Sequence, residues 1–210
     1  CQISACIHGK PSETLTNVVL IAASLGGNHR RLDFLIGPNR ALDTNRYCVI
    51  ATDALGNGLS SSPSNSSLQS GLSFPKFSIR DMVASQAKLL DHLTVSRIFC
   101  VIGASMGGMQ ALQWGVSYPD RMDCLVALTP MARTSAWSQA ITTVSRQLLT
   151  TDEGWKNGQI SIETWRAWTA LMQIIACSTP TAISHNSPDD DLSKLLDTEL
   201  QSLMTNPPDP

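Results

Sequence analysis

Residues 100–115 read CVIGASMGGMQALQWG, and this stretch decides the fold. An apolar run that is typical of a buried strand breaks at glycines around one serine, Ser105, and then continues with helical spacing. Residues 103–107 fit G-x-S-x-G, the nucleophile elbow, in which a sharp strand-to-helix turn holds a serine hydroxyl above a sheet. Gly103 and Gly107 allow that turn to pass close to neighbouring backbone. The pattern predicts Ser105 as a nucleophile.

An oxyanion hole is the second part that such a serine requires. The Met106 N–H stands at the predicted helix start, where one good donor contributes about 3 to 4 kcal/mol to an oxyanion. The second donor is expected in the loop after an earlier strand, LIAASLGGN (20–28), at Leu25 or Gly26. A dinucleotide-binding G-x-G-x-x-G fingerprint is the alternative, and we set it aside because it requires glycine at position 105.

The rest of the chain up to residue 133 predicts an α/β fold with a mostly parallel sheet and helices on both faces. Four apolar runs are short and continuous, as in strands buried on both faces: 17–24, 46–53, 97–103 and 123–130. Cys48, Cys100 and Cys124 lie in these runs and are predicted core residues. Residues 78–93 predict a helix that starts with a Ser78–Asp81 capping box, and Pro119 ends the helix after Ser105.

Two segments interrupt this alternation. Residues 56–73 are rich in serine and glycine, which predicts a solvated loop or a loop that borders a site. From residue 134 the spacing is helical, over 134–149, 162–177 and 191–204. We therefore divide the chain into an α/β core at 1–133, which carries the elbow, and a helical lid or cap region at 134–210. The tryptophans of the second region, Trp155, Trp165 and Trp168, fit packing or a lid.

Composition excludes several classes of protein. The net charge of −2 gives no electrostatic reason to expect nucleic acid, and no run of 18 apolar residues predicts a membrane span. The six cysteines form no C-x-x-C pair, so no metal site is predicted. Free core thiols and the absence of a signal-peptide pattern favour a soluble, cytoplasmic protein. We expect a small-molecule substrate as partner, and a homodimer is one of the open oligomeric states.

Four stretches together resemble one family: 35–58, 74–93, 103–114 (GASMGGMQALQW) and 118–122 (YPDRM). They are similar to the homoserine O-acetyltransferase family of α/β-hydrolase-fold enzymes, over most of residues 9–150. The resemblance implies a ping-pong reaction in which a serine takes an acetyl group from acetyl-CoA, with no tightly bound cofactor, and passes it to homoserine. An aspartate and a histidine complete the family's triad.

The resemblance assigns residues only where the motifs match. Ser105 matches the nucleophile, the Leu25 region matches the oxyanion loop, and Arg146 falls near a substrate-site arginine, although a surface arginine on a helix is an equal alternative. Two departures bear on specificity: Ala23 replaces a usual histidine, and GASMGG replaces GGSMGG. An esterase of unknown substrate and an inactive remnant therefore stay as alternatives.

The triad acid and base are not found in the chain. In this fold both follow the serine, in the order acid then histidine, on loops after later strands. Only His185 follows Ser105, and it lies between helical stretches, as expected of a loop histidine. The acidic candidates Asp120, Asp123, Asp152 and 189–191 fit strand flanks, a helix connection and a helix start. The earlier histidines, His8, His29 and His92, fit surface or loop positions. We therefore predict that the chain stops before the last strands and is inactive alone.

Overall fold

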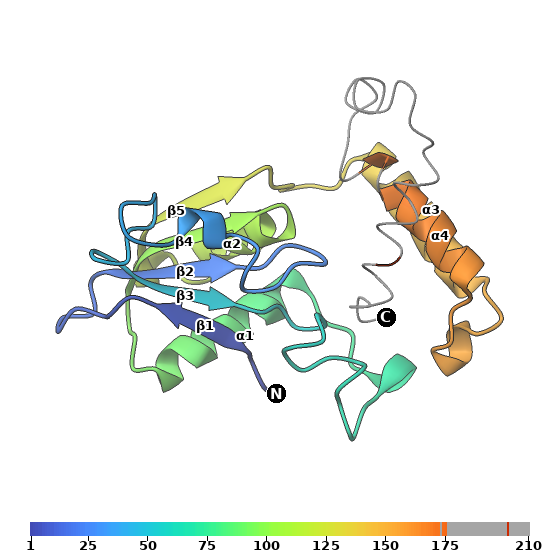
Figure 1. The fold of residues 1–210 in the computed structure, drawn as a ribbon, viewed down its shortest axis with the longest axis horizontal. Helices are drawn as coiled ribbons and strands as arrows, with labels where there is room; N and C mark the ends of the chain where they lie inside the picture. The colour runs from blue at the N-terminus through green and yellow to red at the C-terminus, as the bar shows by residue number, and fades with distance from the viewer. Residues whose placement is uncertain (173, 176–200, 202–210) are drawn as a thin grey trace. The chain divides into compact units, whose positions relative to one another are not determined.

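The computed structural model describes residues 1–172, 174–175 and 201, which fall into two compact units. Unit 1 is residues 1–133 and unit 2 begins at residue 134. Unit 1 contains a five-stranded sheet and two α-helices (Figure 1). Its elements are β1 (Ala5–His8), β2 (Val18–Ala22), β3 (Cys48–Thr52), α1 (Ile79–His92), β4 (Ile98–Ala104), α2 (Met106–Ser117) and β5 (Met122–Leu128), with 3-10 turns η1 (Asp33–Leu35), η2 (Gly71–Ser73) and η3 (Pro119–Arg121).

The sheet has the strand order β1-β3-β2-β4-β5. β2, β3, β4 and β5 pair in parallel, as the four continuous apolar runs predicted, and β1 is antiparallel to β3. Sequence reasoning missed β1 because it has only four residues, which alternate in exposure without a continuous apolar run. Parallel pairing brings the carboxyl ends of β2, β3 and β4 side by side at one end of the strands, where the predicted serine lies.

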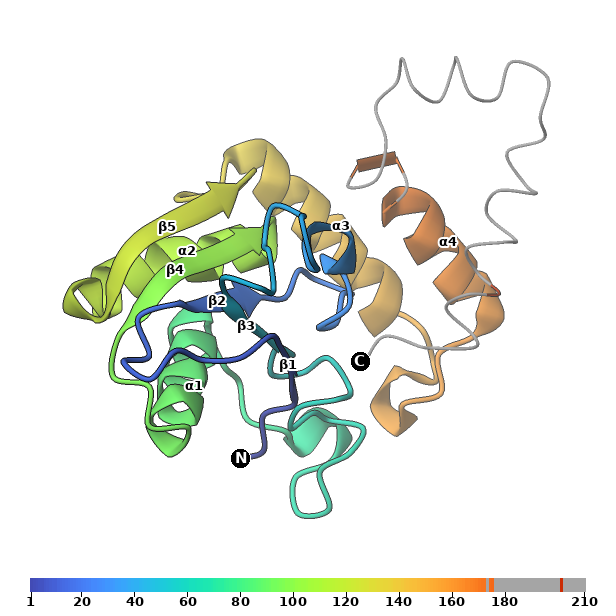
Figure 2. The same ribbon diagram turned by 60° about the vertical axis from the view of Figure 1, so that its left-hand side comes forward.

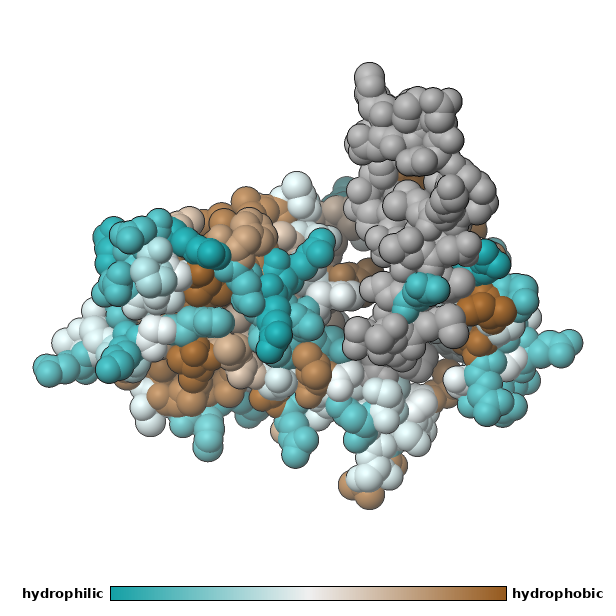
Figure 3. Space-filling model, in the orientation of Figure 1, coloured by the Kyte–Doolittle hydropathy of each residue, from teal (hydrophilic) through white to brown (hydrophobic). Residues whose placement is uncertain are grey.

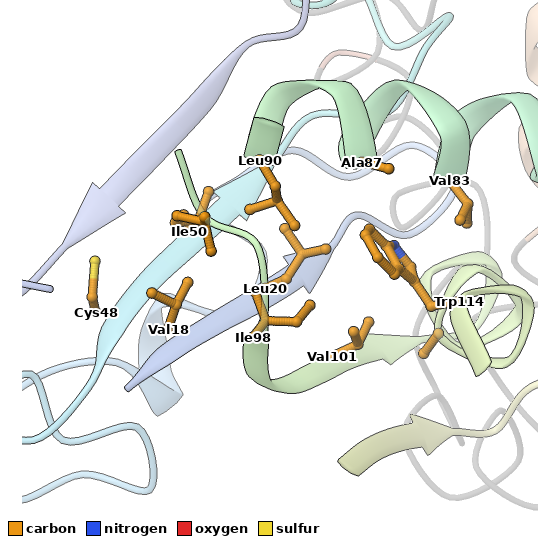
Figure 4. Packing of buried hydrophobic residues seen from close by; sticks show 12 residues of the cluster. Val18, Leu20, Cys48, Ile50, Val83, Ala87, Leu90, Ile98, Val101 and Trp114 are labelled. Atoms are coloured by element: carbon orange, nitrogen blue, oxygen red, sulfur yellow. The ribbon is translucent and has the colours of Figure 1, made fainter. Parts of the chain in front are cut away.

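The two faces of the sheet bury different clusters. One cluster joins Val18 and Leu20 of β2 to Val83 and Leu90 of α1 and to Trp114 of α2 (Figure 4). Figure 2 shows α1 and α2 together on this side of the sheet. The other cluster is covered by the connection between β2 and β3, through Leu32, Ile36 and Leu42. The all-buried pattern of β2 and β3 follows from this double cover.

Helix α1 begins where its sequence predicted. The Ser78 hydroxyl accepts from the Asp81 N–H at 3.4 Å, and Asp81 Oδ2 accepts from the Ser78 N–H at 2.8 Å, which completes the capping box. The Ser78 hydroxyl also donates to Asp81 Oδ2 at 2.6 Å, and this bond, followed by the one from the Ser78 N–H, holds the pKa of the Asp81 carboxyl below its ordinary value. The cap fixes the start of the helix, and Val83 and Leu90 then pack on the sheet, while Met82 packs in a small cluster with Ala23 and Ala54.

β5 departs from its prediction. It was expected to be buried on both faces, yet Val126 and Leu128 are 41% and 44% exposed, and Cys124, a predicted core residue, is exposed. The physical reason is that, among the residues that the structure describes, no strand pairs with the far side of β5, so its side chains lack neighbours there. Hydrophobic residues are visible over this edge of unit 1 in Figure 3. Cys48 and Cys100 are buried, as predicted.

The serine-rich loop at residues 56–73 is ordered by its own hydroxyls. Ser60 and Ser62 are fully buried, which corrects the prediction of a solvated loop at these two positions. Ser60 Oγ donates to Asp53 O at 2.9 Å, and Ser62 Oγ donates to Ser60 O at 2.7 Å. These hydroxyls donate to backbone carbonyl groups that would otherwise need hydrogen bonds from water.

Unit 2 contains α3 (Ala136–Thr150), the 3-10 turn η4 (Trp155–Asn157) and α4 (Ile162–Met172). These match the first two helical stretches expected after residue 134, and the third, at 191–204, lies outside the described residues apart from 201. Trp168 Nε1 donates to Ser145 Oγ at 2.8 Å, which joins α4 to α3. Within the described part of the chain, no helix is long and apolar enough to cross a bilayer.

Candidate active site

Ser105 is the single residue between β4 and α2. Its backbone has φ 54° and ψ −120°, a left-handed conformation that costs a residue other than glycine about 1 to 3 kcal/mol. The Ser105 N–H donates to Leu128 O at 2.9 Å, which ties the turn to the end of β5. A strained serine held between a strand and a helix is the geometry that the G-x-S-x-G pattern describes.

The glycines of the motif are required by close backbone contacts. A Cβ added to Gly103 would overlap the Gly107 carbonyl group, and one added to Gly107 would overlap Ala22 O. A Cβ on Gly108 would lie 2.9 Å from Leu128 O. The first turn of α2 therefore packs directly on the ends of β2, β4 and β5 because side chains are absent at these positions.

The loop after β2 lies against the same turn. Ser24 Oγ donates to Ala104 O at 3.1 Å, and the Gly27 N–H closes a turn on Ser24 O at 3.0 Å. Gly26 has a φ of 65°, and Leu25 is 71% exposed. As the first residue of α2, Met106 has an N–H without a partner inside the helix. The Met106 and Leu25 N–H groups stay our predicted oxyanion donors.

A buried carboxylate at the end of β3 was missed by sequence reasoning. Asp53 follows β3 directly and is 1% exposed. Its Oδ1 accepts from the His29 N–H at 2.8 Å and from Asn57 Nδ2 at 3.1 Å, while its Oδ2 lies 2.8 Å from His29 Nδ1. A buried carboxylate with three partners is satisfied without water. It holds together the loops that follow β2 and β3.

His29 therefore has a defined role that its loop position did not reveal. Its side chain is 22% exposed and its ring is oriented by Asp53. Asn57 adds a second connection, since its Nδ2 also lies 3.4 Å from Gly27 O. The available signal was an acidic residue directly after a buried parallel strand, at the edge where sites form in such sheets.

The remaining predicted residues belong to other elements. Arg146 lies on α3 in unit 2 and is exposed, so its assignment to a substrate stays a prediction. Asp123 pairs with Arg97 at 2.6 Å, and Asp120 O accepts from the same side chain. His8 lies in β1 and His92 ends α1. His185 and the acidic run 189–191 lie outside the described residues.

Asp152 acts as the organiser of a turn in unit 2. Its carboxylate accepts from the Ser161 hydroxyl, from Thr164 Oγ1 at 2.7 Å and from the Gly154 N–H at 2.8 Å. The Ser161 hydroxyl above all, and then the Thr164 hydroxyl, hold the pKa of this carboxyl well below its ordinary value. Asp152 thus lies in the connection between α3 and α4, as the sequence predicted, and its carboxylate organises that connection.

Two further groups bear on possible chemistry. Burial, followed by the Cys124 thiol on the neighbouring strand, raises the pKa of Cys100 to about 12, which disfavours a thiolate nucleophile there. Among the described residues, no three His, Cys, Asp or Glu side chains gather as a metal site would require. Ser105 is the nucleophile candidate that the described geometry favours.

Strand order, the strained serine and its glycines together define a class of protein. A family model for the alpha/beta hydrolase fold matches residues 17–161, and the chain belongs to this family. Its curated relatives include the homoserine O-acetyltransferases of Trichlorobacter lovleyi and Methanosarcina acetivorans, each 37% identical. The matches cover 73% and 72% of this chain but 47% and 31% of those proteins. They confirm the resemblance that the sequence predicted.

A solved structure of the acetyl esterase MekB is also similar to this chain. It superposes with a TM-score of 0.87 at 25% identity, over 97% of this chain and 62% of MekB. The chain thus spans less than two thirds of the length of these relatives, which are homoserine O-acetyltransferases and an esterase. The comparisons establish an α/β hydrolase related to both kinds of enzyme.

Proposed function

We propose that this chain carries the nucleophile and oxyanion hole of an acyl-transfer enzyme of the homoserine O-acetyltransferase type. The observation that supports the proposal is Ser105 in a left-handed conformation at the start of α2. The similarity to curated homoserine O-acetyltransferases points to acetyl-CoA as donor and homoserine as acceptor. The buried Cys48 and Cys100, both free thiols, support a reducing, cytoplasmic setting.

The proposed chemistry has two steps. Ser105 Oγ attacks the thioester carbonyl, its proton passes to a base, and the carbonyl oxygen becomes an oxyanion that the Met106 and Leu25 N–H groups stabilise. Collapse of this intermediate breaks the C–S bond, the base returns its proton to the leaving sulfur, and CoA departs while an acetyl-serine remains. The homoserine hydroxyl then attacks the acetyl-serine, which returns Ser105 to its starting state.

A hydrolase is the second candidate. The similarity to the acetyl esterase MekB favours it, and so does Ala23, where the transferase family usually has a histidine. Water replaces homoserine in the second step, while the acetyl-serine is unchanged. The acceptor alone distinguishes the two reactions.

The test uses the full-length product of the gene that encodes this chain. Acetyl-CoA is supplied with and without homoserine, and CoA release, O-acetylhomoserine and the mass of the Ser105 peptide are measured. A transferase releases CoA in step with the acetylated product. CoA release that ignores homoserine and parallels hydrolysis of a small acetyl ester would contradict the transferase and support the hydrolase.

Ser105→Ala is the matched variant. We expect it to abolish the acetyl-peptide and to lower the turnover rate by at least about 10³-fold, because the hydroxyl forms the covalent bond. Ser117→Ala, at the other end of α2, is the control and should retain activity. An unchanged rate in Ser105→Ala would mean that the Ser105 hydroxyl carries no chemistry.

A further inference from the structure

A chain of buried polar side chains lies behind the serine turn. Gln86 of α1 and Gln110 and Trp114 of α2 are each no more than 1% exposed. Buried amides are costly unless every polar group finds a partner, so their contacts define what they do. Figure 4 shows the Trp114 ring between the sheet and α1.

The donor of each bond fixes the orientation of the next amide. Trp114 Nε1 can only donate, and it donates to Gln86 Oε1 at 2.8 Å. The Gln86 amide nitrogen must then point away from the indole, and it donates to Gln110 Oε1 at 2.7 Å. Because Gln110 Oε1 faces Gln86, the Gln110 amide nitrogen must point away from Gln86.

That nitrogen faces both parts of the proposed oxyanion hole. Gln110 Nε2 donates to Ala23 O at 3.0 Å and to Met106 O at 3.3 Å. Ala23 opens the loop that contains Leu25, and Met106 carries the other proposed N–H donor. One side chain thus joins the two segments whose N–H groups must converge on one oxygen.

The neighbouring contacts hold the two segments close together, but they do not fix the directions of the Leu25 and Met106 N–H groups. Gly107 brings the helix onto Ala22, and Ser24 bonds Ala104, so residues on either side of Ala23 also contact the turn. Contact at Gly107 sets how close the segments come, whereas a bond to a carbonyl sets how the next peptide is rotated. The N–H of residue 24 belongs to the same peptide unit as Ala23 O, which places Leu25 one peptide further on.

We propose that Gln110 is a positioning residue of the oxyanion hole, oriented by Gln86 and Trp114. The proposal rests on the proposed function, in which Ser105 is acylated. Its consequence is that loss of the Gln110 amide slows Ser105 acylation without weakening the binding of a small ester, because the affected N–H groups act on the developing oxyanion.

Three variants of the full-length protein test it, each replacing glutamine by methionine to keep side-chain length. Gln110→Met removes the bonds to Ala23 and Met106, and Gln86→Met removes only the upstream bonds. Gln113→Met is the control, since Gln113 lies on the same helix and donates to Ser117 Oγ at 2.7 Å. Each variant is assayed for kcat and KM with a small acetyl ester and for amide hydrogen exchange over residues 23–27.

We expect kcat to fall by about 10²-fold in Gln110→Met, as for loss of one oxyanion donor. The fall should be several-fold in Gln86→Met and absent in Gln113→Met, with KM within a factor of about three in all variants. Exchange of the Gly27 amide, which bonds Ser24 O, should accelerate in the same order. Equal effects of Gln110→Met and Gln113→Met would overturn the proposal.

The exchange measurement separates this proposal from the proposed function. If the unaltered protein never acylates Ser105, the proposed function fails, and unchanged exchange in Gln110→Met would then overturn the positioning role as well. Faster exchange confined to residues 23–27 would support that role by itself. Should Gln110→Met fail to fold, Gln86→Met decides by the same two readouts.

Discussion

The serine turn and the Asp53 centre, which consists of Asp53, His29 and Asn57, lie where the parallel strands end at their carboxyl termini, but they are held by different means. At Ser105, backbone packs on backbone because Gly103 and Gly107 carry no side chains. At Asp53, a buried carboxylate gathers His29 and Asn57 from two loops. The comparison shows two ways to fix backbone: the serine turn is positioned by close packing where side chains are absent, whereas the loops beside it are held by buried polar groups.

The largest effect should come from breaking the backbone packing. Gly107→Ala places a Cβ against Ala22 O and 3.2 Å from Ala23 O. We expect the free energy of unfolding to fall by about 3 kcal/mol or more, because two backbone segments must separate. A fall would identify the close contact as the cause, since replacing glycine by alanine at an open helical position raises helix stability by about 1 kcal/mol. Urea unfolding of the full-length protein measures this difference.

The control for that substitution is Gly158→Ala. Gly158 has a φ of 68° with nothing within 4 Å of an added Cβ, so only conformational strain is introduced. The expected loss is about 1 kcal/mol. Equal losses in the two variants would show that close packing at Gly107 is unimportant.

The next effect should come from the Asp53 centre. Asp53→Ala leaves two His29 donors and one Asn57 donor without their acceptor in a buried site. We expect a loss of about 3 kcal/mol in the free energy of unfolding, measured by urea titration. Asp123→Ala is the control, because the side chains of Asp123 and of its partner Arg97 are each about half exposed. It should lower the free energy of unfolding by less than about 1 kcal/mol. Similar losses would remove the distinction between the two carboxylates.

The smallest effect concerns pH and the turn around Asp152, which is a carboxylate centre in unit 2. Since the pKa of this carboxyl is lowered in the folded state, its contribution is present above the ordinary aspartate pKa of about 3.9. It is lost as the pH falls below that value towards the folded pKa. Amide exchange in α4, followed from about pH 5 to about pH 2.5, should show weakening protection.

Asp152→Asn should weaken that protection at pH 5 and reduce its dependence on pH. Glu153→Gln, one residue along the chain, is the matched control and should keep the dependence. A pH response that is unchanged in Asp152→Asn would assign it to other carboxyl groups.

Sequence reasoning predicted the parts of this molecule that are encoded by contiguous residues. Five neighbouring residues, 103–107, predicted the Ser105 turn, and continuous apolar runs predicted β2, β3 and β4. It overestimated the burial of β5, because position in the strand order decides whether an apolar strand is covered. The capping box of α1 was predicted because its bonds span only three residues.

The Asp53 centre and the Gln110 contacts were not predictable in the same way. The partners of Asp53 lie as far as 24 residues away, with no characteristic spacing, and Ala23 lies 87 residues from Gln110. Gln86 lies on the buried face of α1, but the helical spacing of residues 78–93 could not identify its partner. Side chains that act through tertiary contacts leave no short pattern in a sequence.

The left-handed φ of 54° at Ser105 also has an evolutionary consequence. Glycine occupies this backbone conformation at little cost, while for serine it is unfavourable by about 1 to 3 kcal/mol. In a lineage that no longer used the hydroxyl, selection for stability alone would favour glycine at this codon. The residue found at position 105 in natural variants therefore reports whether the site is still under selection for chemistry.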